Sequence, residues 1–366
     1  MSSTARSKVS AGLPDFPWDL LEPAKARASA HPDGLVDLSI GTPVDPVPAV
    51  IQAALAAAAD APGYPQTMGT PELRQALVAY VSRRCGIDLP TSGVLPTIGS
   101  KELVAWLPVL LGLGPGDTVA IPSVCYPTYE VGARLAGAAV ARADTPDELD
   151  ALVGVRMAWI NSPGNPDGRV LSPAQLRELV DWARSRGVVL VSDECYLELG
   201  WDERPVSALS VAGADSIIAV HSLSKRSNLA GYRAGFVAGD PSVVRELLAV
   251  RKHVGLLVPT PVQAAMVAAL GDDAHVEVQR GRYERRREQL RSALLSAGFR
   301  IDASRAGLYL WATRDEECWS TVDWLAGRGV LGAPGAFYGE AGSRHVRLAL
   351  TATDERIAAA CSRLVP

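Results

Sequence analysis

The chain has 366 residues, of which 48% are hydrophobic and 21% are charged, and its formal net charge is −4. A chain of this length and composition can bury one large core and a smaller one, which is typical of a two-domain soluble enzyme. The small acidic excess argues against nucleic acid or an anionic membrane surface as a partner.

The first residues, 1–11, carry scattered charge without an apolar stretch, so they do not resemble a signal peptide. No run reaches the roughly 18 apolar residues of a membrane span, and we expect a cytoplasmic protein. The cysteines and histidines show no paired spacing of a zinc site or redox dithiol. We therefore expect reduced, mostly buried cysteines and no metal.

Helices are predicted first at residues 49–59 and 71–84, the second with Thr70 as N-cap and Pro71 at the first helical position. Short apolar runs follow at residues 94–98, 118–121, 138–141, 157–160, 188–191, 217–220 and 234–238, mostly separated by helical patterns. This alternation predicts an α/β fold whose large domain holds a mostly parallel seven-stranded sheet covered by helices.

Residues 285–297 lie in a long charged helical pattern that could run between domains. Strand patterns at 308–312 and 346–350 and helical patterns at 318–327 and 354–364 follow, which predicts a smaller α+β domain. We therefore divide the chain into an N-terminal arm, 1–43, that joins the small domain, a large domain, 44–272, and a small C-terminal domain, 273–366.

Ligands bind beyond the carboxyl ends of the strands in an open parallel sheet, so polar residues after the apolar runs are site candidates. Ser100 and Lys101 follow the first run, where a helix start would offer free N–H groups to a phosphate. Tyr126 follows the second run and can lay its ring on a flat ligand, or it only packs. Asn165 lies in a turn whose prolines and glycines fix the direction of its amide.

Asp193 ends the apolar run 188–191, where a buried carboxylate is costly unless it meets a cation such as a protonated pyridine nitrogen. Tyr196 follows three residues later. The alternatives are a helix cap for Asp193 and a core aromatic for Tyr196.

The most informative stretch runs from Ser222 to Arg233. Lys225 follows the run 217–220 between the hydroxyls of Ser222 and Ser224, and Arg233 stands eight residues on. Burial and nearby positive charge lower the pKa of a lysine, so its free amine can attack a carbonyl and form a Schiff base. The hydroxyls and Arg233 would then hold a phosphate dianion. The alternative is a solvated loop, although a chain with 36 basic residues has only five lysines and has placed one here.

These segments together resemble the fold-type I pyridoxal-phosphate enzymes, the aspartate-aminotransferase superfamily, over nearly the whole chain from about residue 13. The resemblance implies pyridoxal 5′-phosphate as cofactor and Lys225 as the catalytic lysine. It implies that the cofactor phosphate, ring and phenolic oxygen are contacted by Ser100, Lys101, Tyr126, Asn165, Asp193, Tyr196, Ser222, Ser224 and Arg233.

The resemblance also implies a substrate site and a partner subunit. Arg347 matches the arginine that binds the substrate α-carboxylate, with Arg344 as a rival, and Asn165 lies beside that site. Gly41 matches a glycine whose backbone approaches the same carboxylate. Tyr64 resembles the tyrosine that reaches the phosphate of the neighbouring subunit's cofactor, which implies a homodimer with shared active sites.

A narrower resemblance is to the actinobacterial type of N-succinyldiaminopimelate aminotransferases of lysine biosynthesis, carried by segments 13–18, 41–48, 126–137 and 251–253. It implies glutamate as amino donor and N-succinyl-2-amino-6-oxopimelate as acceptor. Arg251, Lys252 and His253 are candidates for the acceptor's distal carboxylate. Asp167, where a threonine is usual, and Ala336, where an acidic residue is expected, depart from the pattern.

Other functions stay open. Another class I or II aminotransferase, acting on aspartate, alanine or aromatic substrates, or a β-lyase with the same cofactor would keep the same core residues. A non-catalytic cofactor-binding domain is disfavoured by the intact set of Lys225, Asp193 and Arg347. A nicotinamide dehydrogenase is disfavoured because the glycine-rich stretch 112–116 precedes a predicted strand instead of following one.

Overall fold

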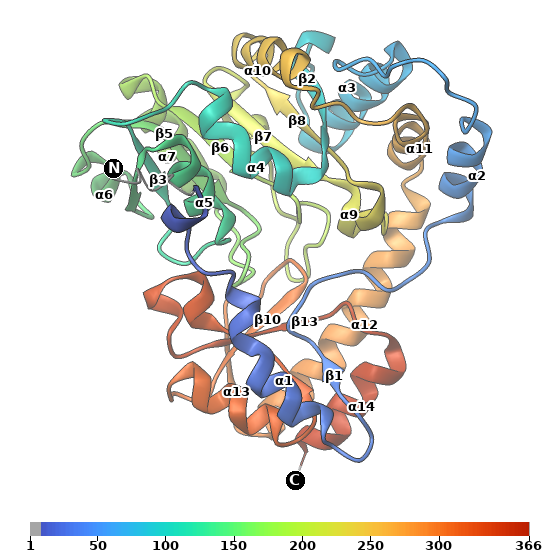
Figure 1. Ribbon diagram of the computed structural model, residues 1–366, viewed down its shortest axis with the longest axis vertical. Coiled ribbons are helices and arrows are strands. Elements are labelled where there is room, and N and C mark those ends of the chain that lie inside the picture. Colours follow the sequence, from blue (N-terminus) through green and yellow to red (C-terminus); the bar gives the residue numbers. More distant parts are fainter. Residues whose placement is uncertain (1–8, 366) are drawn as a thin grey trace, which may run out of the picture.

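The computed structural model describes residues 9–365. A seven-stranded sheet with its helices forms the larger part of the molecule, and a smaller part built mainly from the C-terminal residues lies below it (Figure 1). The long helix α12 (Ala274–Ser296) leads from the larger part into the smaller one, as the charged helical pattern predicted.

The large sheet has the strand order β2-β8-β7-β6-β5-β3-β4. Its strands are β2 (Val94–Ile98), β3 (Thr118–Ile121), β4 (Ala139–Arg142), β5 (Val155–Asn161), β6 (Val189–Asp193), β7 (Ile217–Ser222) and β8 (Ala234–Gly239). Strands β4, β3, β5, β6 and β7 run parallel, and β8 is antiparallel to both of its neighbours. The predicted α/β fold with a mostly parallel seven-stranded sheet is confirmed.

Both faces of this sheet are covered, because alternate side chains of each strand point to opposite faces. On β7, Ile218 and Val220 pack with α4 (Gly99–Leu110), α5 (Thr128–Ala136) and α10 (Pro241–Val254). Ile217 and Ala219 belong to the core on the other face. That core takes in α2 (Ala49–Ala57), α3 (Pro71–Cys85), α6 (Pro146–Asp150), α7 (Pro173–Arg186), α8 (Ala208–Ala212) and α11 (Thr260–Gly271).

Helix α3 begins as the sequence predicted. The Thr70 hydroxyl accepts a hydrogen bond from the Leu73 N–H at 3.2 Å, and Pro71 occupies the first turn. The hydroxyl thereby satisfies one of the backbone donors that a helix start leaves free.

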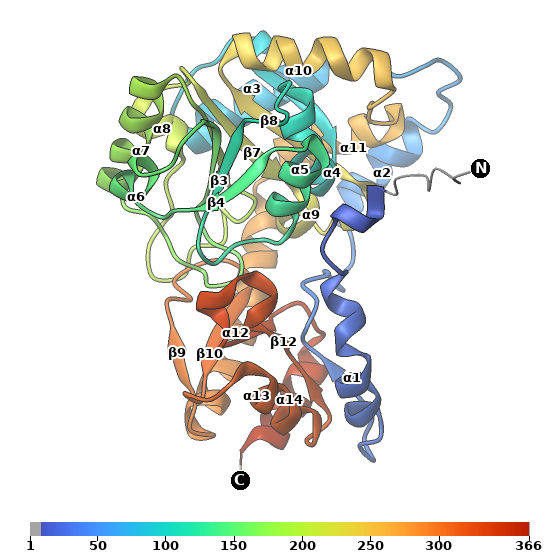
Figure 2. The same cartoon turned by 60° about the vertical axis from the view of Figure 1, so that its left-hand side comes forward.

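The smaller part contains a four-stranded antiparallel sheet in the order β12-β13-β10-β9. Its elements are β9 (Arg300–Asp302), β10 (Tyr309–Thr313), α13 (Cys318–Ala326), β11 (Val330–Leu331), β12 (Ala333–Pro334), β13 (Val346–Ala349) and α14 (Asp354–Leu364). The N-terminal helix α1 (Glu22–Ser29) runs along this part (Figure 2), and β1 (Val36–Asp37) pairs in parallel with β11.

The N-terminal segment shares the hydrophobic core of the smaller part, since Leu21, Val36 and Leu38 pack in one cluster with Leu310 and Leu348. For this reason we propose to keep the division into 1–43, 44–272 and 273–366, although residues 1–8 lie outside the described chain. Among the described helices, none has both the length and the apolar character needed to cross a membrane.

Candidate active site

A cavity of about 930 Å³ is lined by residues of both the larger and the smaller part. Of the residues predicted to contact the cofactor or the α-carboxylate through the family resemblance, all but Tyr64 line it: Gly41, Ser100, Lys101, Tyr126, Asn165, Asp193, Tyr196, Ser222, Ser224, Lys225, Arg233 and Arg347. They converge because β3, β5, β6 and β7 end at one edge of the sheet. Strand β2 ends there too, since β8 is antiparallel to both β2 and β7.

One end of the cavity is cationic. Lys101 and Arg233 both line the cavity, and partial desolvation of Lys101 together with the positive charge of Arg233 lowers the pKa of the Lys101 amine. Gly99 has φ +69°, and a Cβ there would lie 2.4 Å from Nη2 of Arg233, which explains the glycine at this helix start. With the hydroxyls of Ser100, Ser222 and Ser224, this end suits a dianion.

Asp193 supplies a buried carboxylate at the end of β6. Its Oδ2 accepts from the Tyr129 hydroxyl at 2.7 Å and its Oδ1 from the Cys195 N–H at 3.1 Å. Burial raises the pKa of Asp193, and these hydrogen bonds oppose the rise. Within residues 9–365 no cation pairs with this carboxylate, so a cationic group of a ligand fits beside it.

Lys225 lies on the short helix α9 (Leu223–Arg226), and its Nζ donates to the carbonyl of Gly41. Burial lowers the pKa of Lys225; Tyr309 opposes this shift, and the charge of Arg347 adds to it. The amine therefore loses its proton more readily than an exposed lysine does, as a nucleophile and base requires.

Arg347, on β13, is 3% exposed. Its Nη1 donates to Oδ1 of Asn165 at 2.9 Å and its Nη2 to the carbonyl of Ser39 at 2.6 Å. The guanidinium lies 3.9 Å from the ring centroid of Tyr309 and 4.9 Å from that of Tyr338. Its Nε has no partner among the described residues, and the hydrogen bonds it does make are to neutral groups.

A buried guanidinium without an anionic partner fits a site for a ligand carboxylate. The rival Arg344 is exposed, donates to the carbonyl of Asp315 and does not line the cavity.

Three tyrosines of the site were missed by the sequence analysis. Tyr129 holds Asp193, and Tyr309 and Tyr338 enclose Arg347. The strand that carries Tyr309 was predicted, but a strand pattern does not tell which aromatic side chain faces a cavity. Gly41 also has a second role, because a Cβ there would lie 2.2 Å from the Tyr309 hydroxyl.

The candidates for a distal carboxylate are corrected by the structure. Arg251 is fully buried and binds Glu102 through both terminal nitrogens, at 2.9 and 3.1 Å. Lys252 and His253 are exposed on α10, and none of the three residues lines the cavity. The cluster was misjudged because a basic run on a helix does not reveal which member turns inward.

The two departures from the family pattern have clear positions. The side chain of Asp167 stabilises the turn itself, since its Oδ1 accepts a hydrogen bond from the Arg169 N–H at 3.1 Å. Ala336 lines the cavity. Tyr64 is fully exposed and lies away from the cavity of its own chain.

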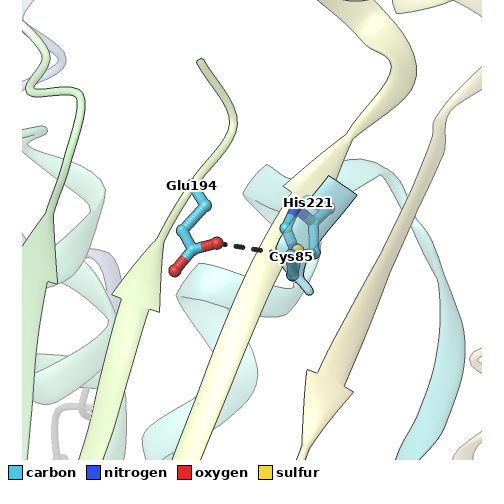
Figure 3. A group of neighbouring side chains, drawn as sticks. All are labelled: Cys85, Glu194 and His221. Atoms are coloured by element: carbon cyan, nitrogen blue, oxygen red, sulfur yellow. Dashed lines mark ion pairs between the residues drawn. The ribbon is translucent and has the colours of Figure 1, made fainter. Parts of the chain in front are cut away.

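A second group of titratable side chains lies behind Asp193. Cys85 from α3, Glu194 after β6 and His221 on β7 point toward one another (Figure 3), with their ligand-type atoms within 4.8 Å. The separate positions of these residues in the sequence gave no sign of this. Burial lowers the pKa of His221 to about 3, with the Arg226 charge adding to the shift, and raises that of Cys85 beyond its usual range. Neutral groups are thus favoured here.

The lining residues fit pyridoxal 5′-phosphate. An amine, a cationic cradle for a phosphate and an unpaired buried carboxylate for a ring nitrogen surround one cavity.

A family model described as aminotransferase class I and II matches residues 33–364. The 4-dedimethylamino-4-oxo-anhydrotetracycline transaminase OxyQ of Streptomyces rimosus is 62% identical over 356 residues, covering 96% of this chain and 99% of its own. A probable aminotransferase of Mycobacterium tuberculosis is 62% identical over 368 residues, covering 99% and 88%. The structure of a probable N-succinyldiaminopimelate aminotransferase from Thermus thermophilus matches with a TM-score of 0.85, 29% identity and coverage of 95% and 99%.

The fold and these matches define a fold-type I pyridoxal-phosphate enzyme. The chain belongs to the class I and II aminotransferases. It is a transaminase with pyridoxal 5′-phosphate as cofactor, and it uses an amino donor and a keto acceptor.

Proposed function

We propose that this transaminase moves the amino group of glutamate to N-succinyl-2-amino-6-oxopimelate, as an N-succinyl-LL-2,6-diaminopimelate:2-oxoglutarate aminotransferase of lysine biosynthesis. The observation that carries the catalytic part is the convergence of Lys225, Asp193 and Arg347 on one cavity that also holds a cationic end. The solved structure of the probable N-succinyldiaminopimelate aminotransferase from Thermus thermophilus, which has the same fold, supports the substrate.

The cofactor, when bound, supplies an aldehyde for the substrate amine and a ring that accepts the electrons left on Cα. Ser100, Lys101, Ser222, Ser224 and Arg233 would hold its phosphate, and Asp193 would keep the ring nitrogen protonated. Tyr126 would pack against the ring, and Asn165 and Tyr196 would hold the phenolic oxygen. The Asn165 carbonyl oxygen already accepts from Arg347, which leaves its NH₂ group for this contact.

Lys225 would be the base that takes the proton from Cα of the amino donor and, in the second half-reaction, gives a proton to the carbon of the acceptor that is aminated. Arg347 binds the α-carboxylate, with Asn165 and the Gly41 backbone beside it. In this arrangement the unpaired guanidinium gains its anion only when an amino or keto acid is present.

The rest of the cavity is wide and mostly apolar, with Leu13, Phe16, Trp18, Ile40 and Phe337 in its wall beside the charged Asp15, Glu130 and Arg142. Arg142 is the remaining arginine of the lining, since Lys101, Arg233 and Arg347 are assigned to the phosphate and the α-carboxylate. Its Nη2 lies 3.4 Å from Oε2 of Glu130, a partly exposed pair that a ligand carboxylate would have to join or replace. We assign the distal carboxylate of the acceptor to Arg142 in place of the 251–253 cluster.

The Lys225→Ala protein tests the mechanism. It should lose the visible absorbance that the cofactor acquires in the wild-type protein, and transamination should fall by about 10³-fold or more, since a base and nucleophile is removed. Transamination at the wild-type rate would rule the mechanism out.

A second acceptor is favoured by one observation. OxyQ, 62% identical over nearly the whole chain, is named for a 4-oxo-anhydrotetracycline substrate, and the aromatic wall of the cavity suits a flat ring system. A screen with glutamate and the succinylated semialdehyde, 4-dedimethylamino-4-oxo-anhydrotetracycline, oxaloacetate, pyruvate and an aromatic keto acid separates the candidates. Turnover of the semialdehyde less than about tenfold above the other acceptors would reject our assignment, and elimination products would indicate a β-lyase.

Substitution of Arg142 tests the substrate in a second way. Arg142→Gln should lower kcat/KM for the succinylated acceptor about 10- to 100-fold, the worth of one charged hydrogen bond, and leave pyruvate turnover unchanged. Lys252→Gln is the matched control and should alter neither.

We also propose that the protein acts as a homodimer in which Tyr64 reaches the neighbouring subunit's cofactor phosphate. Its complete exposure and its distance from its own cavity support this role.

A further inference from the structure

Two buried tyrosines meet between the larger and the smaller part of the molecule. Tyr196 follows β6 and Tyr309 lies on β10, and their exposed fractions are 6% and 4%. Their hydroxyl oxygens are 3.2 Å apart, and the rings are T-shaped with centroids 5.9 Å apart. Both residues line the cavity, so this hydrogen bond lies at the reaction site.

The hydroxyl of Tyr309 is held in place from three sides. The Arg347 guanidinium covers the ring at 3.9 Å, and the absence of a side chain at Gly41 leaves room for the hydroxyl. The described residues offer this hydroxyl one hydrogen-bond partner, Tyr196.

The number of protons decides the direction of this hydrogen bond once the cofactor is bound. A tyrosine hydroxyl has one proton to donate and can accept as well. In the proposed function, Tyr196 donates its proton to the phenolic oxygen, so it can only accept from Tyr309. A hydroxyl that accepts a hydrogen bond becomes a stronger donor, because successive hydrogen bonds polarise one another.

The charges nearby favour the same direction. The titratable groups facing Tyr309 are Tyr196, Cys195, Lys225, Arg347, Tyr126, Tyr338 and Tyr283. Burial raises the pKa of Tyr309, but the positive charges of Arg347 and Lys225 bring it below the usual value. Burial and the neighbouring Tyr309 raise the pKa of Tyr196. The positive charges of Arg347 and Lys225 thus favour Tyr309 as the donor.

We propose that Tyr309 is a positioning residue for transamination: its hydroxyl donates to Tyr196 and thereby strengthens the hydrogen bond from Tyr196 to the phenolic oxygen of the cofactor. The inference rests on the role of Tyr196 in the proposed function. It concerns a residue that the family resemblance did not single out in the sequence.

The test measures the visible absorption of the cofactor-loaded protein against pH. A hydrogen bond to the phenolic oxygen stabilises the form in which this oxygen is negative and the lysine-linked nitrogen has lost its proton. Weakening that bond raises the midpoint of the absorption change. Tyr309→Phe should raise it by about half a pH unit, the worth of a modest hydrogen bond, and Tyr196→Phe by more.

The double variant separates this route from a direct effect on Lys225 or Arg347. If Tyr309 acts through Tyr196, the Tyr196→Phe/Tyr309→Phe midpoint should equal that of Tyr196→Phe alone. Tyr338→Phe is the matched control, because Tyr338 packs on the same guanidinium and its hydroxyl has no partner among the described residues. Its midpoint should stay at the wild-type value. The KM of Tyr309→Phe for glutamate should stay within about twofold, since the ring beside Arg347 is kept.

An unchanged or lowered midpoint in Tyr309→Phe would overturn the proposal. So would a further rise when Tyr309→Phe is added to Tyr196→Phe. A wild-type protein that acquires no visible absorbance with pyridoxal phosphate would overturn the proposed function together with this role. Failure of the Tyr309 role alone differs from that case, because the wild type then colours normally.

Discussion

Arg347 combines deep burial with a free charge. Its hydrogen bonds go to the Asn165 amide and a backbone carbonyl, and its Nε is unpaired within the described residues. An uncompensated buried charge lowers the stability of a fold, so its presence points to a gain in ligand binding. At this residue, activity and stability therefore have opposite requirements.

Replacing Arg347 with methionine should separate the two requirements. We expect kcat/KM for glutamate to fall by at least about 10²-fold, since charged hydrogen bonds to the α-carboxylate are lost. The melting temperature should be equal to or above that of the wild type, because no unpaired charge remains buried. Steady-state kinetics and calorimetry measure both quantities. The exposed Arg344→Met should change neither, and a destabilised but active Arg347→Met protein would contradict the assignment.

Glu194 gives the fold a pH dependence. Its Oε1 accepts from Ser192 and from the Ala208 N–H, both at 2.9 Å, whereas Oε2 faces His221 and Cys85 without a hydrogen bond in the described chain (Figure 3). Burial raises the pKa of Glu194 from 4.5 to about 7. The folded state therefore holds this proton more tightly than the unfolded state, and stability falls as pH rises from about 4.5 to about 7.

The Glu194→Gln protein should lack this loss. The difference in unfolding free energy between Glu194→Gln and wild type should shift in favour of the variant by about 2–3 kcal/mol between pH 5 and pH 8. Urea unfolding at both pH values measures it. The lowered pKa of His221 has the opposite effect, because the fold loses stability as the pH falls below the usual histidine pKa of 6.5. Both proteins share that effect. Parallel pH curves for the two proteins would show that Glu194 is ionised throughout.

At the level of elements, the ion pair between Arg251 and Glu102 joins α10 to α4, the helix that begins at the cationic end of the cavity. Arg251→Met should cost about 3–5 kcal/mol of stability, because Glu102 then keeps a partly buried charge without its partner. The double variant with Glu102→Gln should recover most of that loss. Denaturant unfolding measures both variants, and acceptor preference should stay that of the wild type. A change in acceptor preference without a loss of stability would return Arg251 to the substrate site.

The sequence predicted the elements well, because strand and helix periods depend on local pattern. The seven strands of the large sheet lie within three residues of their predicted bounds, and α14 has the predicted bounds. The sequence patterns did not predict which side chains of a helix or strand are buried and which face solvent or the cavity. Arg251 faces inward while Lys252 faces solvent, and Tyr309 reaches the cavity only because β10 pairs with β13. The group of Cys85, Glu194 and His221 requires three distant segments to meet.

In the whole molecule, the cavity joins two cores. Asp193 ends β6 of the large sheet and Lys225 lies on α9 directly after β7, whereas Arg347 and Tyr309 lie on strands of the small sheet. Their joint contacts mean that substrate binding at Arg347 and chemistry at Lys225 require both parts to be correctly placed. Tyr64 extends this dependence to a second subunit in the proposed homodimer.

Mixing two impaired variants tests whether Tyr64 acts across subunits. Tyr64→Phe should weaken cofactor binding about 10- to 100-fold, the worth of one hydrogen bond to a charged phosphate, and Lys225→Ala should be inactive. In a mixed dimer, the subunit with intact Lys225 would receive Tyr64 from its partner, so one of the two sites is complete. After exchange in equal amounts, activity at limiting cofactor should rise toward about a quarter of the wild-type value, since half of the dimers are mixed. Sedimentation measures the oligomeric state in parallel. Activity equal to the sum of the separate variants would place Tyr64 outside the partner's site.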